Sequence, residues 1–344
     1  MIYDLTAILS RQARVRANMN HRLTRGVLLA AALSTVPMGS ASSAQPAESS
    51  RLVAASEFQS LMAALSNWRR WGADDELGTL NLITTEVRRA AAKQIRDGVA
   101  LSLARRIETV AEGVVPERAR LRMLAMGTTV NVTAHTDELT IAPHGAVFTH
   151  FDAPAHFFWK GEMYNGVPRA TVRDSGAPRL NVDAAAAGVF TRGVLIDVAR
   201  CKGVAQLAPA TPITDIDLEE CLKAERVELG SGDAVLIRTG RASGPPDRRA
   251  GLHVSAVQLL KRHDIALAGS DSSIDAWPSG VAGVRSPIHV LLLVAMGTPI
   301  LDHLELDRLG NLAAEKCRWE FLLTLAPLRI AGATGSAVNP TAIF

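Results

Sequence analysis

The stretch Thr-His-Phe-Asp-Ala-Pro-Ala-His-Phe at positions 149–157 constrains this chain more than any other. Pro154 disfavours a long regular helix through it and holds the preceding residue near an extended conformation. In an extended segment His150, Asp152 and His156 occupy positions of the same parity, so their side chains can point to one side. Two imidazoles and a carboxylate that converge from a rigid segment suit a divalent cation such as zinc or manganese.

The same stretch has a simpler interpretation. A His-x-Asp pair is often only a hydrogen-bonded couple on a loop, so the spacing does not by itself establish a metal site. His144 lies just upstream. Aromatic residues make up only 4% of the chain, yet several gather here, which indicates either a substrate pocket or ordinary core: Phe148, Phe151, Phe157, Phe158 and Trp159.

The first 44 residues have the layout of a secretory signal peptide. Arg22 and Arg25 precede an apolar run at 26–36, and a small-residue cleavage site ends at Ala44. The apolar run is too short to span a bilayer as a stable helix. We therefore expect export to the periplasm or secretion; a retained amphipathic extension is the alternative.

Either Met1 or Met19 is the start, and Met19 places the signal at about 19–44, followed by a linker at 45–56 and one domain at 57–344. Removing residues 1–44 takes away five arginines and one aspartate, so the formal net charge falls from +3 to −1. Without a basic excess, we expect neither nucleic acid nor an anionic membrane as a partner. With 48% hydrophobic residues, the remaining chain can bury a large core.

The three cysteines, Cys201, Cys221 and Cys317, are widely spaced and form no CxxC arrangement. A zinc site built on thiolates is therefore not indicated, and three cysteines do not make a disulfide framework. We expect buried free thiols. One disulfide is the alternative in an exported protein, and geometry would decide it.

Strands and helices alternate along the chain, which predicts a single α/β domain. Helices are expected near 58–68, 85–96 with Thr85 as N-cap, 214–226 with a capping box from Thr214 to Asp217, and 255–263. Strands are expected at 100–107, 126–134, 193–199, 234–237, 265–269 and 321–330, with His135 in a loop. The chain has no Walker A, GxGxxG or GxSxG motif, so nucleotide binding and serine hydrolase chemistry lack support.

Polar residues in the second half of the chain are candidates for further ligands. Asp271 and Asp275 follow the strand expected at 265–269 and are interpreted either as functional groups or as caps of backbone amides. His289 opens an apolar run, and Asp302 lies 13 residues later. A lone histidine at such a place is more often a structural hydrogen-bonding group. With Asp302, it is also the candidate for a second ligand set.

At these residues the sequence resembles the cyclase family of metal-dependent hydrolases, which includes bacterial kynurenine formamidase and isatin hydrolase. The resemblance covers nearly all of the chain after the leader, including Trp-Gly-Ala-Asp-Asp-Glu-Leu-Gly-Thr at 71–79, Lys-Gly-Glu-Met-Tyr-Asn-Gly at 160–166 and the tail at 335–340. The family signature H-x-G-T-H-x-D-x-P-x-H is matched at Thr149, His150, Asp152, Pro154 and His156.

Two features depart from the family pattern. Ala146 stands at the position of the first histidine of the signature and Phe148 at that of its glycine, while His144 lies two positions too early. Asp302 is the nearest equivalent of a glutamate ligand of the family and is one methylene shorter.

The resemblance implies a single-domain, swivelling β/β/α-like fold of mixed sheet with surrounding helices, and one or two zinc or manganese ions. By position, His150, Asp152, His289, Asp302 and His144 would provide the metal ligands. His156 would transfer protons. The residues expected to contact the substrate are Trp68, Trp71, Phe148, Phe158, Trp159 and Ser273.

The implied reaction is hydrolysis of a C–N bond in an amide, formamide or cyclic amide by metal-activated water. The expected substrate is a small aromatic or cyclic amide, and the expected assembly is a homodimer or homotetramer. Two alternatives remain. One is a secreted small-molecule-binding protein on a weakened hydrolase scaffold, and the other is a metal-dependent lactonase or dehydratase at the same site.

Overall fold

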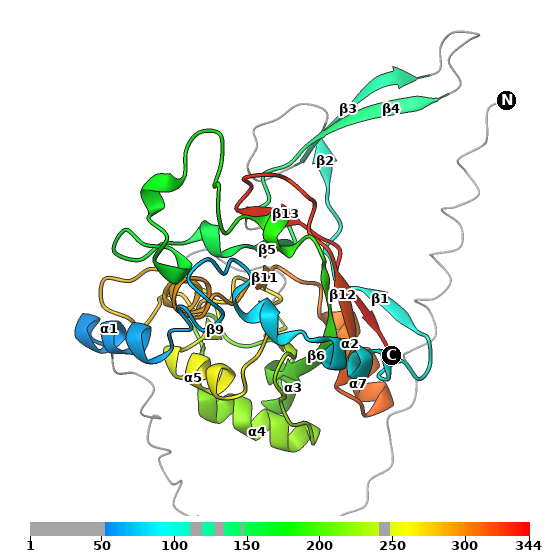
Figure 1. Ribbon diagram of the computed structural model, residues 1–344. Helices are drawn as coiled ribbons and strands as arrows, with labels where there is room; N and C mark the ends of the chain where they lie inside the picture. The colour runs from blue at the N-terminus through cyan, green and yellow to red at the C-terminus, as the bar shows by residue number, and fades with distance from the viewer. Residues whose placement is uncertain (1–51, 111–118, 127–133, 146–147, 241–247) are drawn as a thin grey trace, which may run out of the picture. The chain divides into compact units, whose positions relative to one another are not determined.

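The computed structural model describes residues 52–110, 119–126, 134–145, 148–240 and 248–344. Its centre is a nine-stranded mixed sheet that curls into a half-barrel (Figure 1). In spatial order the strands are β1 (Ala100–Ser102), β14 (Thr341–Ile343), β12 (Glu320–Leu325), β6 (Val189–Asp197), β8 (Ala234–Arg238), β10 (Leu267–Ser270), β11 (Ile300–Asp302), β5 (His150–Asp152) and β13 (Gly335–Ala337). The predicted α/β class is confirmed.

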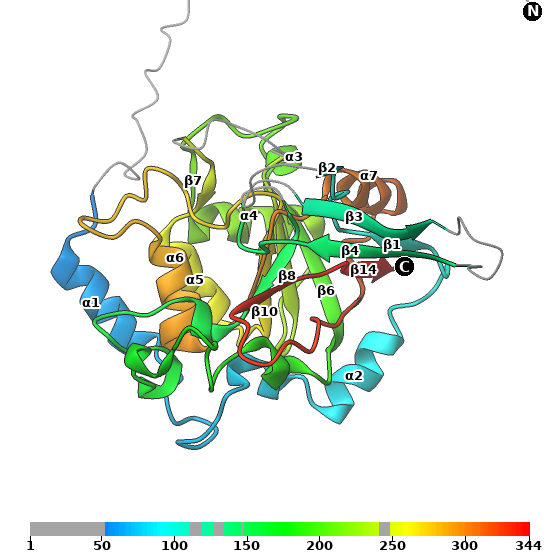
Figure 2. The same cartoon turned by 90° about the horizontal axis from the view of Figure 1, so that it is seen from above.

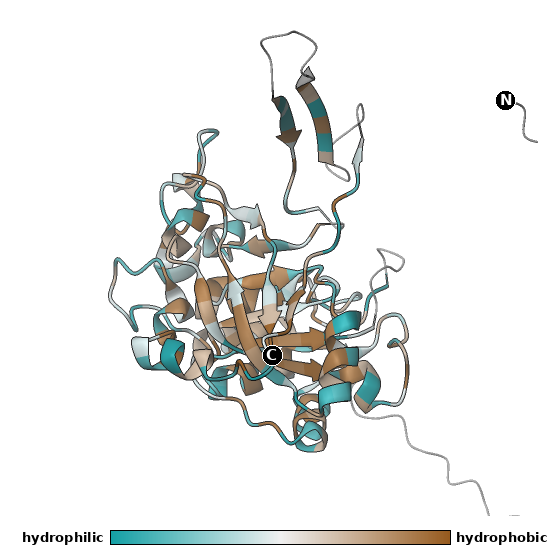
Figure 3. Ribbon diagram, turned by 90° about the vertical axis from the view of Figure 1, so that its right-hand side faces the viewer, coloured by the Kyte–Doolittle hydropathy of each residue, from teal (hydrophilic) through white to brown (hydrophobic). Residues whose placement is uncertain are grey.

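The four central strands, β6, β8, β10 and β11, run parallel, and antiparallel strands flank them on both sides. Successive side chains of a strand point to opposite faces. Val194 and Val235 accordingly join the core on one face of the sheet, while Leu195 and Leu236 join the core on the other. Both faces are therefore buried, as expected for parallel strands. Figure 3 shows these hydrophobic strands between more polar helices.

Helices cover both faces of the sheet (Figures 1 and 2). Residues of α1 (Ala55–Ala64), α4 (Asp215–Glu225) and α5 (Val254–Arg262) contribute to one core, and residues of α2 (Thr85–Ala92) and α7 (Asp307–Lys316) pack on the other. The short helices are α3 (Val198–Cys201), α6 (Pro287–His289), and the 3-10 turns η2 (Gly78–Leu82), η3 (Pro154–His156), η4 (Tyr164–Gly166), η5 (Arg169–Thr171) and η6 (Val182–Ala185).

Of two predicted helix starts, the capping box of α4 is as expected and the N-cap of α2 lies one residue earlier. The capping box of α4 is confirmed, since Thr214 and Asp217 each accept a hydrogen bond from the backbone N–H of the other. The N-cap of α2 is Thr84, not Thr85, because Thr84 is extended and its side chain accepts from Val87 N. Helix α1 ends at Ala64, so Trp68 lies beyond it.

The apolar run after His289 forms a π-helix, η7 (Val290–Met296), in which every residue is buried. A helix that is hydrophobic on all sides belongs in the interior. Gly297 ends η7 in the left-handed conformation, with φ of 65°. A Cβ atom there would lie 2.5 Å from the Tyr164 ring, so this turn requires glycine.

A second sheet of three strands, β2 (Thr109–Val110), β3 (Ala119–Met126) and β4 (His135–Thr140), extends from the edge of the main sheet (Figures 1 and 3). The prediction of a loop at His135 is wrong, because His135 opens β4 and pairs with Met126. Most of the strand expected at 126–134 lies outside the described residues. The third sheet pairs β7 (Pro212–Ile213) with β9 (Gly251–Leu252).

Cys201 of α3 and Cys221 of α4 form a disulfide, so the prediction of buried free thiols is wrong for this pair. Helices α3 and α4 contact each other and bring the two Cα atoms to 5.6 Å, within the range that a disulfide bridges. Cys317 is a free thiol, but it is exposed.

The predicted signal peptide lies outside the described residues. Part of the expected linker at 45–56 belongs to the domain, because Val53 is buried, pairs with Val281, and is followed by α1 from Ala55. Among the described residues, no helix combines the length and the apolar composition that a membrane span requires.

Candidate metal centre

Strand β5 carries the centre of the site. It lies between β11 and β13, so that His150 pairs with Asp302 of β11 while Asp152 pairs with Gly335 of β13. His150 and Asp152 are two positions apart on one strand and therefore share a face of the sheet. Both are buried, Asp152 completely.

A first group of side chains meets at one oxygen of Asp152. His144 Nδ1 lies 2.8 Å from Asp152 Oδ1, His150 Nε2 lies 3.6 Å from it, and His156 Nε2 lies 4.0 Å from it. His144 and His156 stack, with ring centroids 3.7 Å apart. His144, His150 and Asp152 are arranged so that they could hold one cation.

A second group meets at the other oxygen of Asp152. His289 Nε2 lies 3.5 Å from Asp152 Oδ2 and 3.4 Å from Asp302 Oδ2. All three side chains are buried and form a second possible ligand set. Asp152 therefore belongs to both groups, with one carboxylate oxygen facing each.

Contacts outside the two groups orient these ligands. His150 Nδ1 donates to the carbonyl of Phe148 at 2.7 Å, which leaves Nε2 facing Asp152. His289 Nδ1 is hydrogen-bonded to Asp275, which leaves its Nε2 toward Asp152 and Asp302. Such partners on the far nitrogen are typical of metal-binding histidines.

One orphaned atom shows that a cation fits. Asp152 Oδ2 is buried and makes no hydrogen bond within the described part of the chain. A buried carboxylate oxygen without a hydrogen bond is costly, and histidine nitrogens with carboxylate oxygens are the donors that zinc and manganese accept. Asp152 Oδ1, in contrast, accepts a hydrogen bond from His144 Nδ1, and a bound cation would take the place of that proton.

The electrostatics assign different protonation to different members of the site. Burial opposes the charged form of Asp152, but the surrounding histidines hold its pKa well below the usual range. Burial, together with the neighbouring histidines, lowers the pKa of His156 to about 4 against the attraction of Asp152. At neutral pH Asp152 is therefore charged, while His156 is neutral and can accept a proton.

Gly335 makes room for His144. A Cβ atom at this position would lie 2.3 Å from His144 Cε1 and 2.9 Å from the carbonyl of Phe151. His144 Nε2 also lies 3.0 Å from the hydroxyl of Thr334. Gly335, the first residue of β13, and the preceding Thr334 therefore position His144, which itself comes from the segment before β5.

A sequence profile of the cyclase family matches residues 59–276, which is more than half of the chain. The chain belongs to the cyclase family. No curated protein sequence matches it. Among solved structures it is similar to a crystal structure described as a novel cyclase, with 29% identity and a TM-score of 0.74 over 82% of this chain and 99% of that one.

Isatin hydrolases show the same fold at lower identity. Isatin hydrolase A from Labrenzia aggregata is 18% identical, with a TM-score of 0.52 over 73% of this chain and 94% of that one. Isatin hydrolase A from Ralstonia solanacearum is 19% identical, with a TM-score of 0.51 over 74% of this chain and 93% of that one. These matches support the cyclase-family fold.

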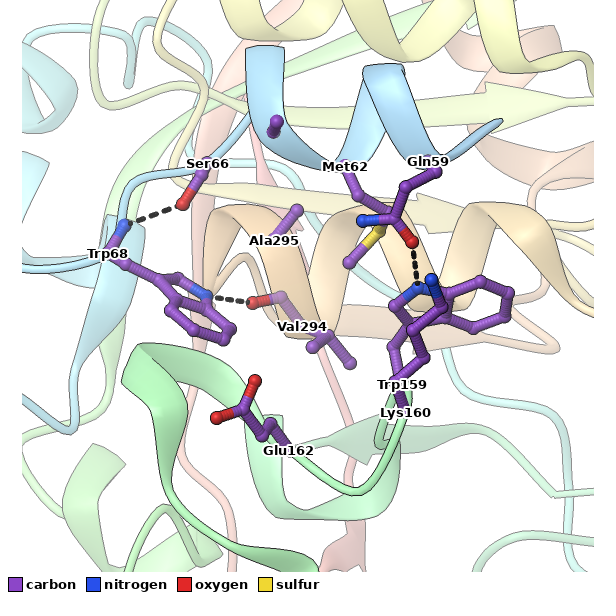
Figure 4. A pocket seen from close by; sticks show the side chains of 10 residues that line it. Gln59, Met62, Ser66, Trp68, Trp159, Lys160, Glu162, Val294 and Ala295 are labelled. Atoms are coloured by element: carbon purple, nitrogen blue, oxygen red, sulfur yellow. Dashed lines mark hydrogen bonds between the residues drawn. The ribbon is translucent and has the colours of Figure 1, made fainter. Parts of the chain in front are cut away.

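The six residues expected to contact substrate in this cyclase-family protein lie in different surroundings. Trp68 and Trp159 line one cavity, whose lining contains none of the candidate metal ligands (Figure 4). Trp71 lies under the guanidinium of Arg70, and Phe158 under that of Arg169. Phe148 is buried and touches the site through its carbonyl, and Ser273 is half-buried. Their contact with substrate stays a prediction.

Three further residues lie at this centre; the sequence indicated Asp275 as a functional group or cap and Phe157 as pocket or core, but did not single out His303. Asp275 acts as a cap, since it accepts from the backbone N–H of Ile288 and His289, and it also orients the His289 ring. Phe157 packs against the rings of His156 and His289, at 4.9 and 4.8 Å. His303, buried beside His150 with ring centroids 5.7 Å apart, could have been suspected only because it follows Asp302.

Proposed function

We propose that this protein is a metal-dependent hydrolase that cleaves a C–N bond in an amide, formamide or cyclic amide. One observation carries the proposal. Asp152 presents one oxygen to each of two possible ligand groups, and a neutral His156 lies 4.0 Å from the first of those oxygens. A cation site beside a proton acceptor is what hydrolysis by activated water requires.

In this proposal five residues hold one or two zinc or manganese ions: His144, His150, Asp152, His289 and Asp302. A divalent cation there supplies Lewis acidity, which lowers the pKa of water from 15.7 to about 7 and polarises a carbonyl oxygen. Asp275 and the carbonyl of Phe148 fix the histidine rings so that the correct nitrogens face the site.

His156 is the proposed proton carrier. Water adds its oxygen to the carbonyl carbon and the C–N bond breaks, so one proton must move from the attacking water to the leaving nitrogen. His156 Nε2 accepts that proton and returns it. Its lowered pKa keeps it in the accepting form before the reaction. Phe157, packed on His156 and His289, would form an apolar wall for an aromatic or cyclic substrate.

The geometry favours a hydrolase over the alternative of a binding protein on a weakened scaffold. The sequence departs from the family at Ala146 and Asp302. Ala146 lies outside the described residues, but His144 reaches Asp152 at 2.8 Å. Asp302, despite its shorter side chain, reaches His289 at 3.4 Å. A lactonase or dehydratase would use the same groups, so a panel of amides, lactones and hydroxy acids must separate the reactions.

The test is metal content together with turnover. Protein purified without added metal or chelator should contain one to two equivalents of zinc or manganese, by mass spectrometry, and should hydrolyse members of a panel that includes isatin and N-formylkynurenine. His150→Ala should lose both metal and turnover. Metal-free protein that stays inactive after reconstitution would overturn the proposal in favour of the binding protein.

We also propose export to an oxidising compartment, as the N-terminal sequence predicts. The disulfide between Cys201 and Cys221 supports this, because disulfides are rare in reducing cytosol. A mature N-terminus near Gln45 in the periplasmic fraction would bear it out. A homodimer or homotetramer is proposed from the family resemblance alone, and light scattering would test it.

A further inference from the structure

A cavity of about 250 Å³ is lined by residues of α1, η7 and the segments around Trp68 and Trp159 (Figure 4). The indoles of Trp68 and Trp159 stand at its two sides. Met62 and Ala63 of α1 and Val294 and Ala295 of η7 contribute apolar lining between them. No candidate metal ligand lines this cavity, and neither does His156.

The end of η7 holds the first indole in place. The last carbonyls of a helix have no partner within it. Here Trp68 Nε1 donates to the carbonyl of Val294 at 2.7 Å, and the next two carbonyls accept from the backbone N–H and the side-chain amide of Asn67, each at 2.9 Å. The indole N–H is therefore used inside the protein.

The second indole is fixed in the same manner. Trp159 Nε1 donates to Gln59 Oε1 at 3.1 Å, and its ring packs edge-on against Phe58, with centroids 5.1 Å apart. Since both N–H groups are already bonded, the two tryptophans offer the cavity only their apolar edges and faces. These are the surfaces on which another aromatic ring stacks.

We propose that this cavity is a second small-molecule site, which binds a flat, neutral aromatic compound of one or two fused rings between the two indoles. The small size of the ligand is inferred from the volume of the cavity, which is below the roughly 300–1,000 Å³ of pockets for drug-sized ligands. We infer a neutral ligand because the ammonium of Lys160 and the carboxylate of Glu162, both in the lining, cancel each other. The cavity therefore has no net charge that would attract an ion.

The site is independent of the proposed hydrolysis. Phe157, which packs on His156 and His289, is two residues before Trp159 and is not part of the cavity lining. The ligand would therefore contact none of the candidate metal ligands, and its binding does not require a metal-ligating residue.

Ala63 offers a direct test. It is an exposed residue in the last turn of α1 and lines the cavity, whereas its neighbour Ala64 is also exposed and does not line it. Isothermal titration of indole into metal-loaded protein should show saturable binding. Ala63→Phe, which fills the cavity, should weaken binding at least tenfold, and Ala63→Leu should weaken it less. Ala64→Phe should bind as the wild type does.

Two results would overturn the proposal. The first is absence of saturable indole binding to folded wild-type protein. The second is unchanged binding in Ala63→Phe. If binding unchanged by Ala63→Phe is lost in His150→Ala, the ligand lies at the metal centre instead. Thermal unfolding of each variant confirms that it is folded, and its metal content, measured separately, shows whether the metal centre itself has failed.

Discussion

The rings of His144 and His156 lie face to face, with centroids 3.7 Å apart and planes inclined by 8°. His144 comes from the segment before β5 and His156 from the turn after it, so the stack closes over Asp152 from both ends of the strand. This contact holds His156 within reach of the proposed cation site. Burial first, and then the neighbouring histidines with His144 among them, lower the pKa of His156.

Replacing His156 with asparagine removes the proposed proton carrier and leaves the ligand groups intact. We expect kcat/KM to fall by about 10²–10⁴-fold, the usual contribution of such a group, with metal content unchanged. Activity assays and mass spectrometry of the same preparation check this. His135→Asn, at an exposed position of β4, is the matched control. If metal is lost together with turnover, His156 belongs to the ligand set instead.

Gly335→Ala should disturb His144, because the added Cβ would lie 2.3 Å from its ring. We expect metal affinity to fall and the free energy of unfolding to drop by about 1–3 kcal/mol, as overpacking typically causes. Chemical unfolding and metal titration measure the two effects. Adding His144→Ala relieves the clash with the ring, though not the 2.9 Å approach to the Phe151 carbonyl, so the double variant should be more stable than the sum of the single effects predicts. Strict additivity would contradict the clash.

Asp275→Asn should weaken the second ligand group without touching a ligand. An amide at this position can donate to His289 Nδ1, which favours the ring tautomer with the proton on Nε2, the wrong nitrogen. Loss of such an orienting partner typically costs 10–100-fold in metal affinity. Competition titration of the variant with a chelator should show that the ion held by the second ligand group is lost first. Asp174→Asn, an exposed aspartate, should behave as wild type.

The disulfide should contribute measurably to stability. It closes a loop between positions 20 residues apart, for which chain entropy predicts about 3 kcal/mol. Cys201→Ser with Cys221→Ser should therefore lower the free energy of unfolding by about that amount and make it insensitive to reductant. Cys317→Ser, at the exposed free thiol, should change neither property. Equal stability of wild type with and without reductant would mean that the bond contributes little.

Glu225 predicts a pH dependence of stability. Burial raises its pKa to about 8, further increased by Asp197, although it accepts a hydrogen bond from the Asp197 backbone. The folded state therefore binds more protons than the unfolded state between pH 4.5 and 8, so this group makes stability fall as pH rises through that window. Glu225→Gln should flatten the fall and stabilise the protein at pH 8. Exposed Glu220→Gln should not.

Local sequence alone determined the parts of the site that depend on neighbours in the chain. The spacing of His150, Asp152 and His156 around Pro154 was sufficient to predict an extended segment followed by a turn, and β5 and η3 have that form. The capping box of α4 and the class of fold were predictable for the same reason. The patterns used for these predictions, namely alternating apolar residues, helix caps and prolines, depend only on residues a few positions apart.

His289 and Asp302 were already candidate ligands from the sequence, but only the tertiary structure decided how these distant residues meet Asp152. The pairing of β11 and β13 with β5 brings Asp302 and Gly335 beside a histidine and an aspartate more than 140 residues earlier in the chain. Such register depends on the packing of whole strands, which no local pattern reports. The disulfide, the π-helix and the cavity that Trp68 and Trp159 line arise in the same way, because each follows from how helices pack on the sheet.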